Sequence, residues 1–96
     1  MRLNQTLLSQ LEELLREVGY RVRYEKGNFR GGRCVVEDQR LVVVNSFSPV
    51  ASRATTLIEV VLSLPITEAA LSEDHRRLLH HLRRTHQPAA TGLFAE

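Results

Sequence analysis

The chain has 96 residues, 43% hydrophobic and 25% charged, which indicates one folded domain and excludes a disordered chain. Its longest wholly apolar run, Leu41 to Val44, is far shorter than the roughly 20 residues of a membrane-spanning helix, so no membrane partner is expected. The net charge of +2 is mild, the single cysteine, Cys34, cannot form an intramolecular disulfide, and no secretory signal is visible, so the cytoplasm is the expected compartment.

The first predicted element is an amphipathic helix over residues 4–18. Asn4 can cap its first turn, and Gly19 can adopt the left-handed conformation that ends it. Its apolar residues recur at the i, i+3, i+4, i+7 spacing of one helical face, namely Leu7, Leu8, Leu11, Leu14, Leu15 and Val18.

From Tyr20 the pattern changes to strict alternation, which is typical of a strand. Tyr20 and Tyr24 alternate with Arg21 and Arg23, so the tyrosines are predicted to face the helix while the arginines face water. A glycine-rich loop over residues 26–32 is expected to follow.

Two further strands are predicted over residues 33–37 and 40–45, and the polar pair Asp38-Gln39 joins them as a hairpin. Cys34 fits the first of them as a small core residue. The second contains an unbroken run of aliphatic residues, which favours a central position in the sheet.

A second helix is predicted from Ser48-Pro49, with Ser48 as its cap, to Pro65. Either Thr67 or Ser72 can cap a third helix, whose apolar face would consist of Leu71, His75, Leu78, Leu79 and Leu82. Residues 85–96 lack periodicity and are expected to form a poorly ordered tail.

This order of elements indicates an α+β fold with a single domain over residues 1–84. We expect a three-stranded antiparallel sheet with the first two helices on one of its faces. The third helix is expected to complete the core or to form an interface.

Four histidines, at His75, His80, His81 and His86, lie in or just after the third predicted helix. Helical ligands of one metal ion are three or four residues apart, whereas these are five, one and five residues apart. The arginines between them would also repel a divalent cation. We therefore expect no metal, no stoichiometric zinc and no cofactor.

A basic stretch with interleaved aromatic residues spans the first predicted strand and the loop after it. Its cations are Arg21, Arg23, Lys26, Arg30 and Arg33, which could contact a phosphate backbone, as in proteins that bind single strands. The alternation that exposes the arginines turns Tyr20 and Tyr24 toward the core, which disfavours base stacking. Nucleic-acid binding is therefore an alternative hypothesis and not the favoured one.

No catalytic constellation is recognisable in the sequence. Ser46 and Ser48 follow the third predicted strand but lie in no G-x-S-x-G turn, and capping accounts for Ser48. The carboxylates are spread over helical and turn surfaces, so no acid–base pair stands out. A non-enzymatic protein is expected.

An apolar strand ending in Asn, Leu41-Val42-Val43-Val44-Asn45, is followed by Ser48, Arg53 and the helical stretch Thr56-Leu57-Ile58-Glu59-Val60-Val61-Leu62. This arrangement resembles ImmA/IrrE-type, minimal zincin-like metallopeptidases, in which the helix carries H-E-x-x-H. The resemblance implies a helix packed on a short sheet and places Glu59 where the general base would be. Because Ile58 and Leu62 replace both zinc-binding histidines, peptidase activity is not expected.

The chain as a whole is also similar to small uncharacterised bacterial proteins that bear a Tyr-Glu-Lys-Gly-Asn-Phe-x-Gly-Gly stretch, here Tyr24 to Gly32. That likeness implies no function. The favoured hypothesis, reached by elimination, is a non-enzymatic protein-interaction module that binds another protein or a second copy of itself.

Val60 and Leu62 are the candidate interface residues, because they lie off the main apolar stripe of the second helix. A two-fold homodimer that buries this helix or a sheet edge is expected. The alternatives are nucleic-acid binding through residues 21–33 and a catalytically inactive, peptidase-like scaffold that binds a peptide.

Overall fold

The computed structural model describes residues 2–26 and 33–86, and the predicted tail beyond residue 86 and the packing of the Cys34 side chain lie outside what it describes. The elements are α1 (Gln5–Glu17), β1 (Arg21–Glu25), β2 (Arg33–Val36), β3 (Leu41–Asn45), α2 (Val50–Ser63) and α3 (Glu73–Thr85), with short 3₁₀ turns at η2 (Glu37–Gln39) and η3 (Glu68–Ala70). Within the described ranges, no helix is long and apolar enough to cross a membrane.

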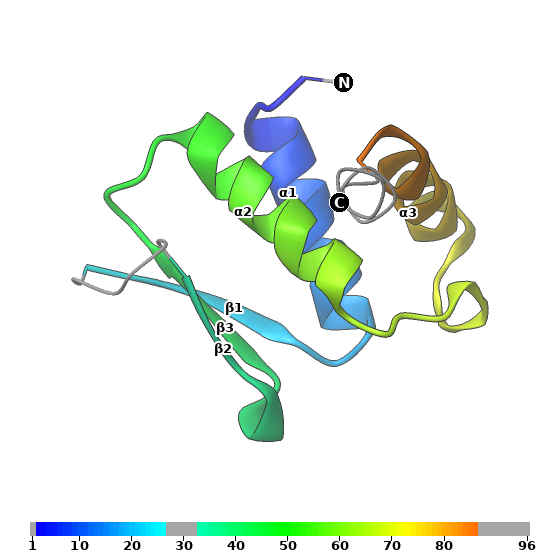
Figure 1. Cartoon of the computed structure of the whole chain (residues 1–96), viewed down its shortest axis with the longest axis horizontal. Helices are drawn as coiled ribbons and strands as arrows, with labels where there is room; N and C mark the ends of the chain where they lie inside the picture. Colours follow the sequence, from blue (N-terminus) through cyan, green and yellow to red (C-terminus); the bar gives the residue numbers. More distant parts are fainter. Residues whose placement is uncertain (1, 27–32, 87–96) are drawn as a thin grey trace, which may run out of the picture.

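The sheet has the strand order β1-β3-β2, with β3 in the centre as its apolar run predicts (Figure 1). β1 runs parallel to β3, in a register that aligns Val22 with Val42 and Tyr24 with Val44. β2 runs antiparallel to β3. The α+β class is therefore confirmed, but the prediction of an all-antiparallel sheet was wrong.

The error lies in the order of the strands. A chain that runs up β1, down β2 and up β3 gives antiparallel neighbours only if β2 is in the middle. Here β3 lies between the other two, so two strands of the same direction become neighbours. The physical reason is burial, because the most apolar strand takes the central position while β1, with exposed Arg21 and Arg23, takes an edge.

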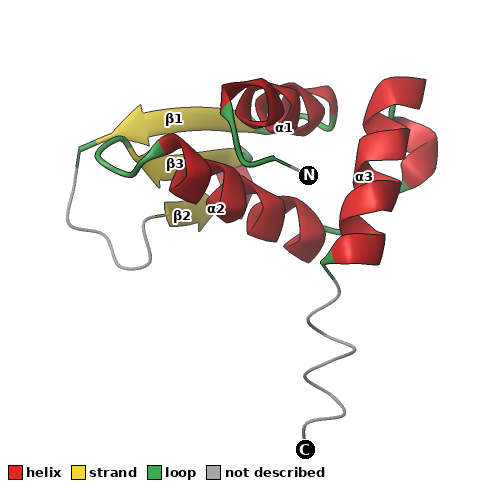
Figure 2. Cartoon of the chain, turned by 90° about the horizontal axis from the view of Figure 1, so that it is seen from above, coloured by secondary structure: helices red, strands yellow, loops and turns green. Residues whose placement is uncertain are grey.

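Helices α1 and α2 lie side by side on one face of the sheet, as predicted (Figures 1 and 2). The side chain of Asn4 accepts the N–H of Leu7 at 2.9 Å and so caps α1. Gly19 follows that helix with φ +93°, the left-handed conformation expected there. The chain can therefore turn directly from α1 into β1, which places the start of the strand beside the end of the helix.

Helix α3 packs against α2 on the side away from the sheet and buries Leu79 and Leu82 completely (Figure 1). It begins after Ser72, one of the two predicted caps, and extends through Thr85, one residue into the predicted tail. The broad apolar surface of α2 thus has a partner within the chain. Val60 is completely buried and offers no surface to a partner, and Leu62 is half-buried against the core.

Candidate functional site: the open edge of β1

The predicted basic residues of β1 are exposed, as expected. Arg21 and Arg23 occupy the strand positions aligned with Leu41 and Val43 of β3. The guanidinium group of Arg23 forms an exposed ion pair with the carboxylate of Glu25 at 3.1 Å. Of these two arginines, Arg23 therefore already has a counter-charge.

Of the remaining cations of the predicted basic stretch, only Lys26 has a side chain that the structure describes. The Lys26 ammonium lies 5.8 Å from the centre of the exposed Phe47 ring, in the loop that leads to α2. Arg33 begins β2 in register with Val44, and its side chain, like the whole of Arg30, lies outside what the structure describes.

Tyr20, just before β1, and Tyr24 within it pack against the core, as predicted, and Tyr24 is engaged from two sides. Its hydroxyl donates a hydrogen bond to the Glu12 carboxylate, and the Arg53 guanidinium carbon lies 5.5 Å from the ring centre. Burial, and then the bond to Glu12, raise the pKa of the Tyr24 phenol above its usual value. Because its ring and hydroxyl are both occupied, Tyr24 is poorly placed to stack on a nucleic-acid base.

The outer edge of β1 is open. The N–H of Arg21 donates to the carbonyl of Arg40 at 2.9 Å, and the carbonyl of Glu25 accepts from the N–H of Ser46 at 3.0 Å. In a parallel ladder, the backbone groups of alternate residues face opposite sides. The N–H and C=O groups of Val22 and Tyr24 therefore point away from β3, toward an edge that no other described strand occupies.

A groove of about 260 Å³ runs beside this edge, between β1 and α1. The helix contributes two side chains one turn apart. The chain from Tyr20 through β1 contributes Val22 and Tyr24, which face the helix, and Arg21, which begins the strand and is exposed. The lining residues are Glu12, Arg16, Tyr20, Arg21, Val22 and Tyr24. We call this hollow the β1 groove.

A larger cleft of about 540 Å³ lies at the end of the β1 groove, between the end of α1 and the end of α2. Its walls include Gly19, Arg40 and the buried Leu64 and Ile66. Tyr20 lines both hollows, so they adjoin at the start of β1. Arg16 and Arg40 were not among the predicted site residues, because only the tertiary fold brings them to this strand.

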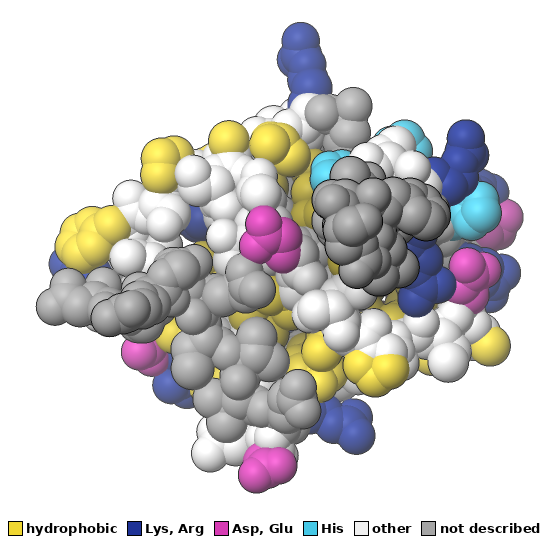
Figure 3. All heavy atoms as spheres, viewed as in Figure 1, with side chains coloured by type: hydrophobic (Ala, Val, Ile, Leu, Met, Phe, Trp, Pro, Cys, Tyr) yellow, Lys and Arg dark blue, Asp and Glu magenta, His cyan; other side chains and the backbone are white. Residues whose placement is uncertain are grey.

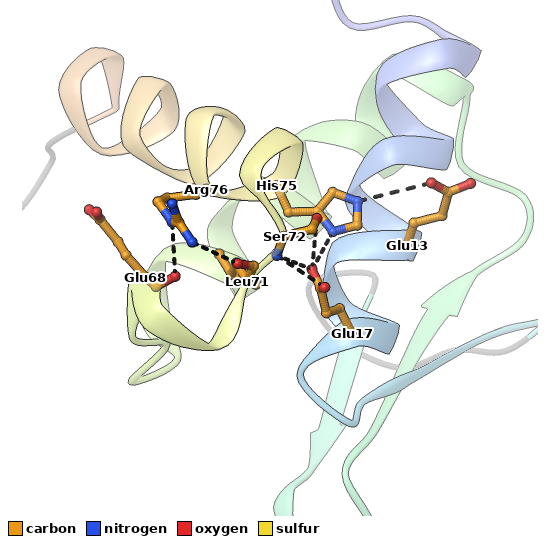
Figure 4. Close-up of polar contacts among 7 residues, drawn as sticks. All are labelled: Glu13, Glu17, Glu68, Leu71, Ser72, His75 and Arg76. Carbon is orange, nitrogen blue, oxygen red and sulfur yellow. Dashed lines mark hydrogen bonds and ion pairs between the residues drawn. The ribbon is translucent and has the colours of Figure 1, made fainter.

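A polar cluster fixes the start of α3 against the end of α1 (Figure 4). The Glu17 carboxylate accepts hydrogen bonds from the N–H of Ser72 at 3.0 Å, and His75 Nδ1 lies 2.6 Å from the same carboxylate. The His75 side chain is 17% exposed and its other ring nitrogen is 4.0 Å from Glu13, so His75 is partly buried, in keeping with its place on the predicted apolar face of the third helix. These contacts serve to attach α3 to α1.

The stability of the fold is expected to depend on the charge of Glu17. The bond from the Ser72 N–H, followed by the contact with His75, lowers the pKa of Glu17 below 4.5. Because the folded pKa is depressed, its contribution is present above pH 4.5 and is lost as the pH falls through the folded value. Urea melts should show that Glu17→Gln has a lower free energy of unfolding than wild type at neutral pH. This difference in free energy should shrink below pH 4.5. A difference that stays constant as the pH falls well below 4.5 would contradict this assignment.

Basic and histidine side chains gather over α3, on the right of Figure 3. His80, His81 and His86 are exposed there, apart from the partly buried His75. No group of three metal-ligating side chains occurs within residues 2–26 and 33–86. The absence of zinc stays a prediction that elemental analysis can test.

The segment that resembles a metallopeptidase serves as core. Ile58, in one of the two histidine positions, is almost completely buried, and the neighbouring Glu59 is exposed. Comparisons with protein-family models, with curated proteins and with solved structures found no match.

Proposed function

We propose that the protein is a non-enzymatic interaction module that binds an extended segment of another protein as a fourth strand on the open edge of β1. The observation that carries the proposal is the outward direction of the N–H and C=O groups of Val22 and Tyr24 beside a lined groove. In such strand addition the backbone bonds supply affinity, and pockets for alternate side chains supply specificity.

The β1 groove suits this mode of binding. Val22 and Tyr24 place their backbones on the edge and their half-buried side chains against the core. A partner strand paired with them would direct alternate side chains toward Glu12 and Arg16 of α1. Helix and strand together therefore offer both backbone partners and side-chain contacts.

Nucleic-acid binding has less support. Arg21 and Arg23, which would contact a phosphate backbone, are exposed. Tyr24, however, is engaged by Glu12 and Arg53 and is not available to stack on a base. A phosphate backbone would also leave the outward amide and carbonyl groups of β1 without strand partners. The peptide hypothesis uses these groups, so we favour it.

A display library of random peptides of about ten residues tests the proposal. Selection on the immobilised full chain is expected to enrich peptides, and a selected peptide added to labelled protein is expected to shift the backbone amide resonances of β1 and α1. Failure to enrich any peptide, or resonance changes confined to α3, would overturn the proposal.

A further inference from the structure

We propose that the segment bound at β1 is acidic, with its carboxylates beside the start of the strand, against Arg16, Arg21 and Arg40. This inference rests on the proposed function, because it names the chemistry of the partner for the same edge. Arg16 and Arg21 line the β1 groove, and Arg40 lines the adjoining cleft. Tyr20 lines both hollows and so links the two sites.

These three arginines are exposed cations without a counter-charge in the described part of the chain. None of their guanidinium groups makes a hydrogen bond or an ion pair there. An incoming carboxylate would form charge-assisted hydrogen bonds with them, which are shorter and stronger than neutral ones. The side chains themselves are therefore ready for an anionic ligand.

The two carboxylates that line the same hollows are already engaged. Glu12 accepts the hydroxyl of Tyr24, and Glu17 accepts the bonds from Ser72 and the contact with His75. These contacts hold both carboxylates in place on α1, so neither forms an ion pair with the arginines. The uncompensated cations thus lie at one end of the groove.

The other end of β1 differs. Arg23 is paired with Glu25, and Lys26 lies over the ring of Phe47. The strand therefore has a cationic start, whereas at its end Arg23 has a counter-charge and Lys26 keeps its charge but already contacts an aromatic ring. This asymmetry predicts a partner segment with its acidic residues at one end and uncharged residues along the remainder.

An acidic segment fits this edge better than a second copy of the chain. In an antiparallel pair centred on Val22, Arg21 of each copy lies opposite Arg23 of the other, and in one centred on Arg23 the two Arg23 side chains are opposite. A pair centred on Tyr24 places Arg23 opposite Glu25, but Glu25 already pairs with Arg23 of its own strand, and this register brings no carboxylate opposite Arg21. Like charges directly opposite each other destabilise a strand pair. Carboxylates at the same positions would be attracted, and they would also speed association at low salt.

The test uses the peptides selected from the random library. Enriched sequences are expected to carry Asp or Glu clustered on one side of a short uncharged stretch. Arg16→Glu and Arg21→Glu should each lower the affinity for the best selected peptide by about tenfold or more. Arg84→Glu is the matched control, because Arg84 is an exposed arginine without a described partner on α3, away from the sheet in Figure 1.

The outcomes separate this inference from the proposed function. Selected peptides that shift the β1 resonances but show no preference for acidic residues would overturn the inference and leave strand addition standing. The same holds if Arg16→Glu and Arg21→Glu bind the peptide as tightly as Arg84→Glu does. Displacement of the peptide by a single-stranded oligothymidylate at physiological salt would also overturn it, in favour of a nucleic-acid ligand. If Arg21→Glu fails to fold, Arg16→Glu alone decides, because it changes only the surface of α1.

Discussion

Replacing Leu57 with alanine is expected to lower the free energy of unfolding by about 2–5 kcal/mol. Leu57 is completely buried on the face of α2 that packs into the core with α1 and the sheet. Its truncation would remove apolar contacts and leave a cavity that a close-packed interior fills only in part. Since small domains are stable by only about 5–15 kcal/mol, much of the total would be lost.

Thr55→Ala provides the matched control on the same helix. Thr55 is exposed, and its hydroxyl only donates to the carbonyl of Ala51 one turn before it at 3.0 Å. This change should move the free energy of unfolding by no more than about 0.5 kcal/mol. Urea melts of both variants are the measurement, and a loss below about 1 kcal/mol for Leu57→Ala would show that its core position has been misassigned.

Replacing Val22 with proline is expected to lower the affinity for a selected peptide by about tenfold or more, whereas Val22→Ala should retain most of that affinity. Proline has no N–H, so it removes a donor from the open edge, and it is tolerated on edge strands. β1 would still bond to β3 through the alternate residues, Arg21, Arg23 and Glu25.

The alanine variant controls for the lost packing of the half-buried Val22 side chain. Circular dichroism and thermal unfolding of both variants show that the fold is retained, and titration of a labelled selected peptide gives the two dissociation constants. Equal affinities for Val22→Pro and Val22→Ala would mean that the peptide does not pair with the backbone of β1.

Local patterns predicted the individual elements well. The leucine spacing of α1, the cap at Asn4 and the turn at Gly19 are confirmed, because each depends on residues close in sequence. The alternation in β1 likewise predicted that Tyr24 faces α1. The uninterrupted aliphatic run predicted that β3 is central.

Strand order and surface sites depend on contacts between distant residues. Nothing local in β1 or β2 shows that β3 inserts between them, and only that order leaves the Val22 side of β1 open next to α1. Val60 was predicted to be an interface residue because the sequence pattern of α2 shows an apolar face but does not identify what packs on it. In the structure Val60 is buried within the chain itself. Arg40 reaches the site only because β3 starts beside Gly19.

Amide hydrogen exchange along β1, measured with and without a selected peptide, tests strand addition most directly. In the protein alone, the amides of Arg23 and Glu25 should be protected by β3, and those of Val22 and Tyr24 should exchange much faster. The bound peptide should slow the exchange of the Val22 and Tyr24 amides and leave the exchange rates of Arg23 and Glu25 nearly unchanged. Equal protection of all four amides in the protein alone, or no slowing at Val22 and Tyr24 when the peptide is bound, would contradict an open edge that accepts a partner strand.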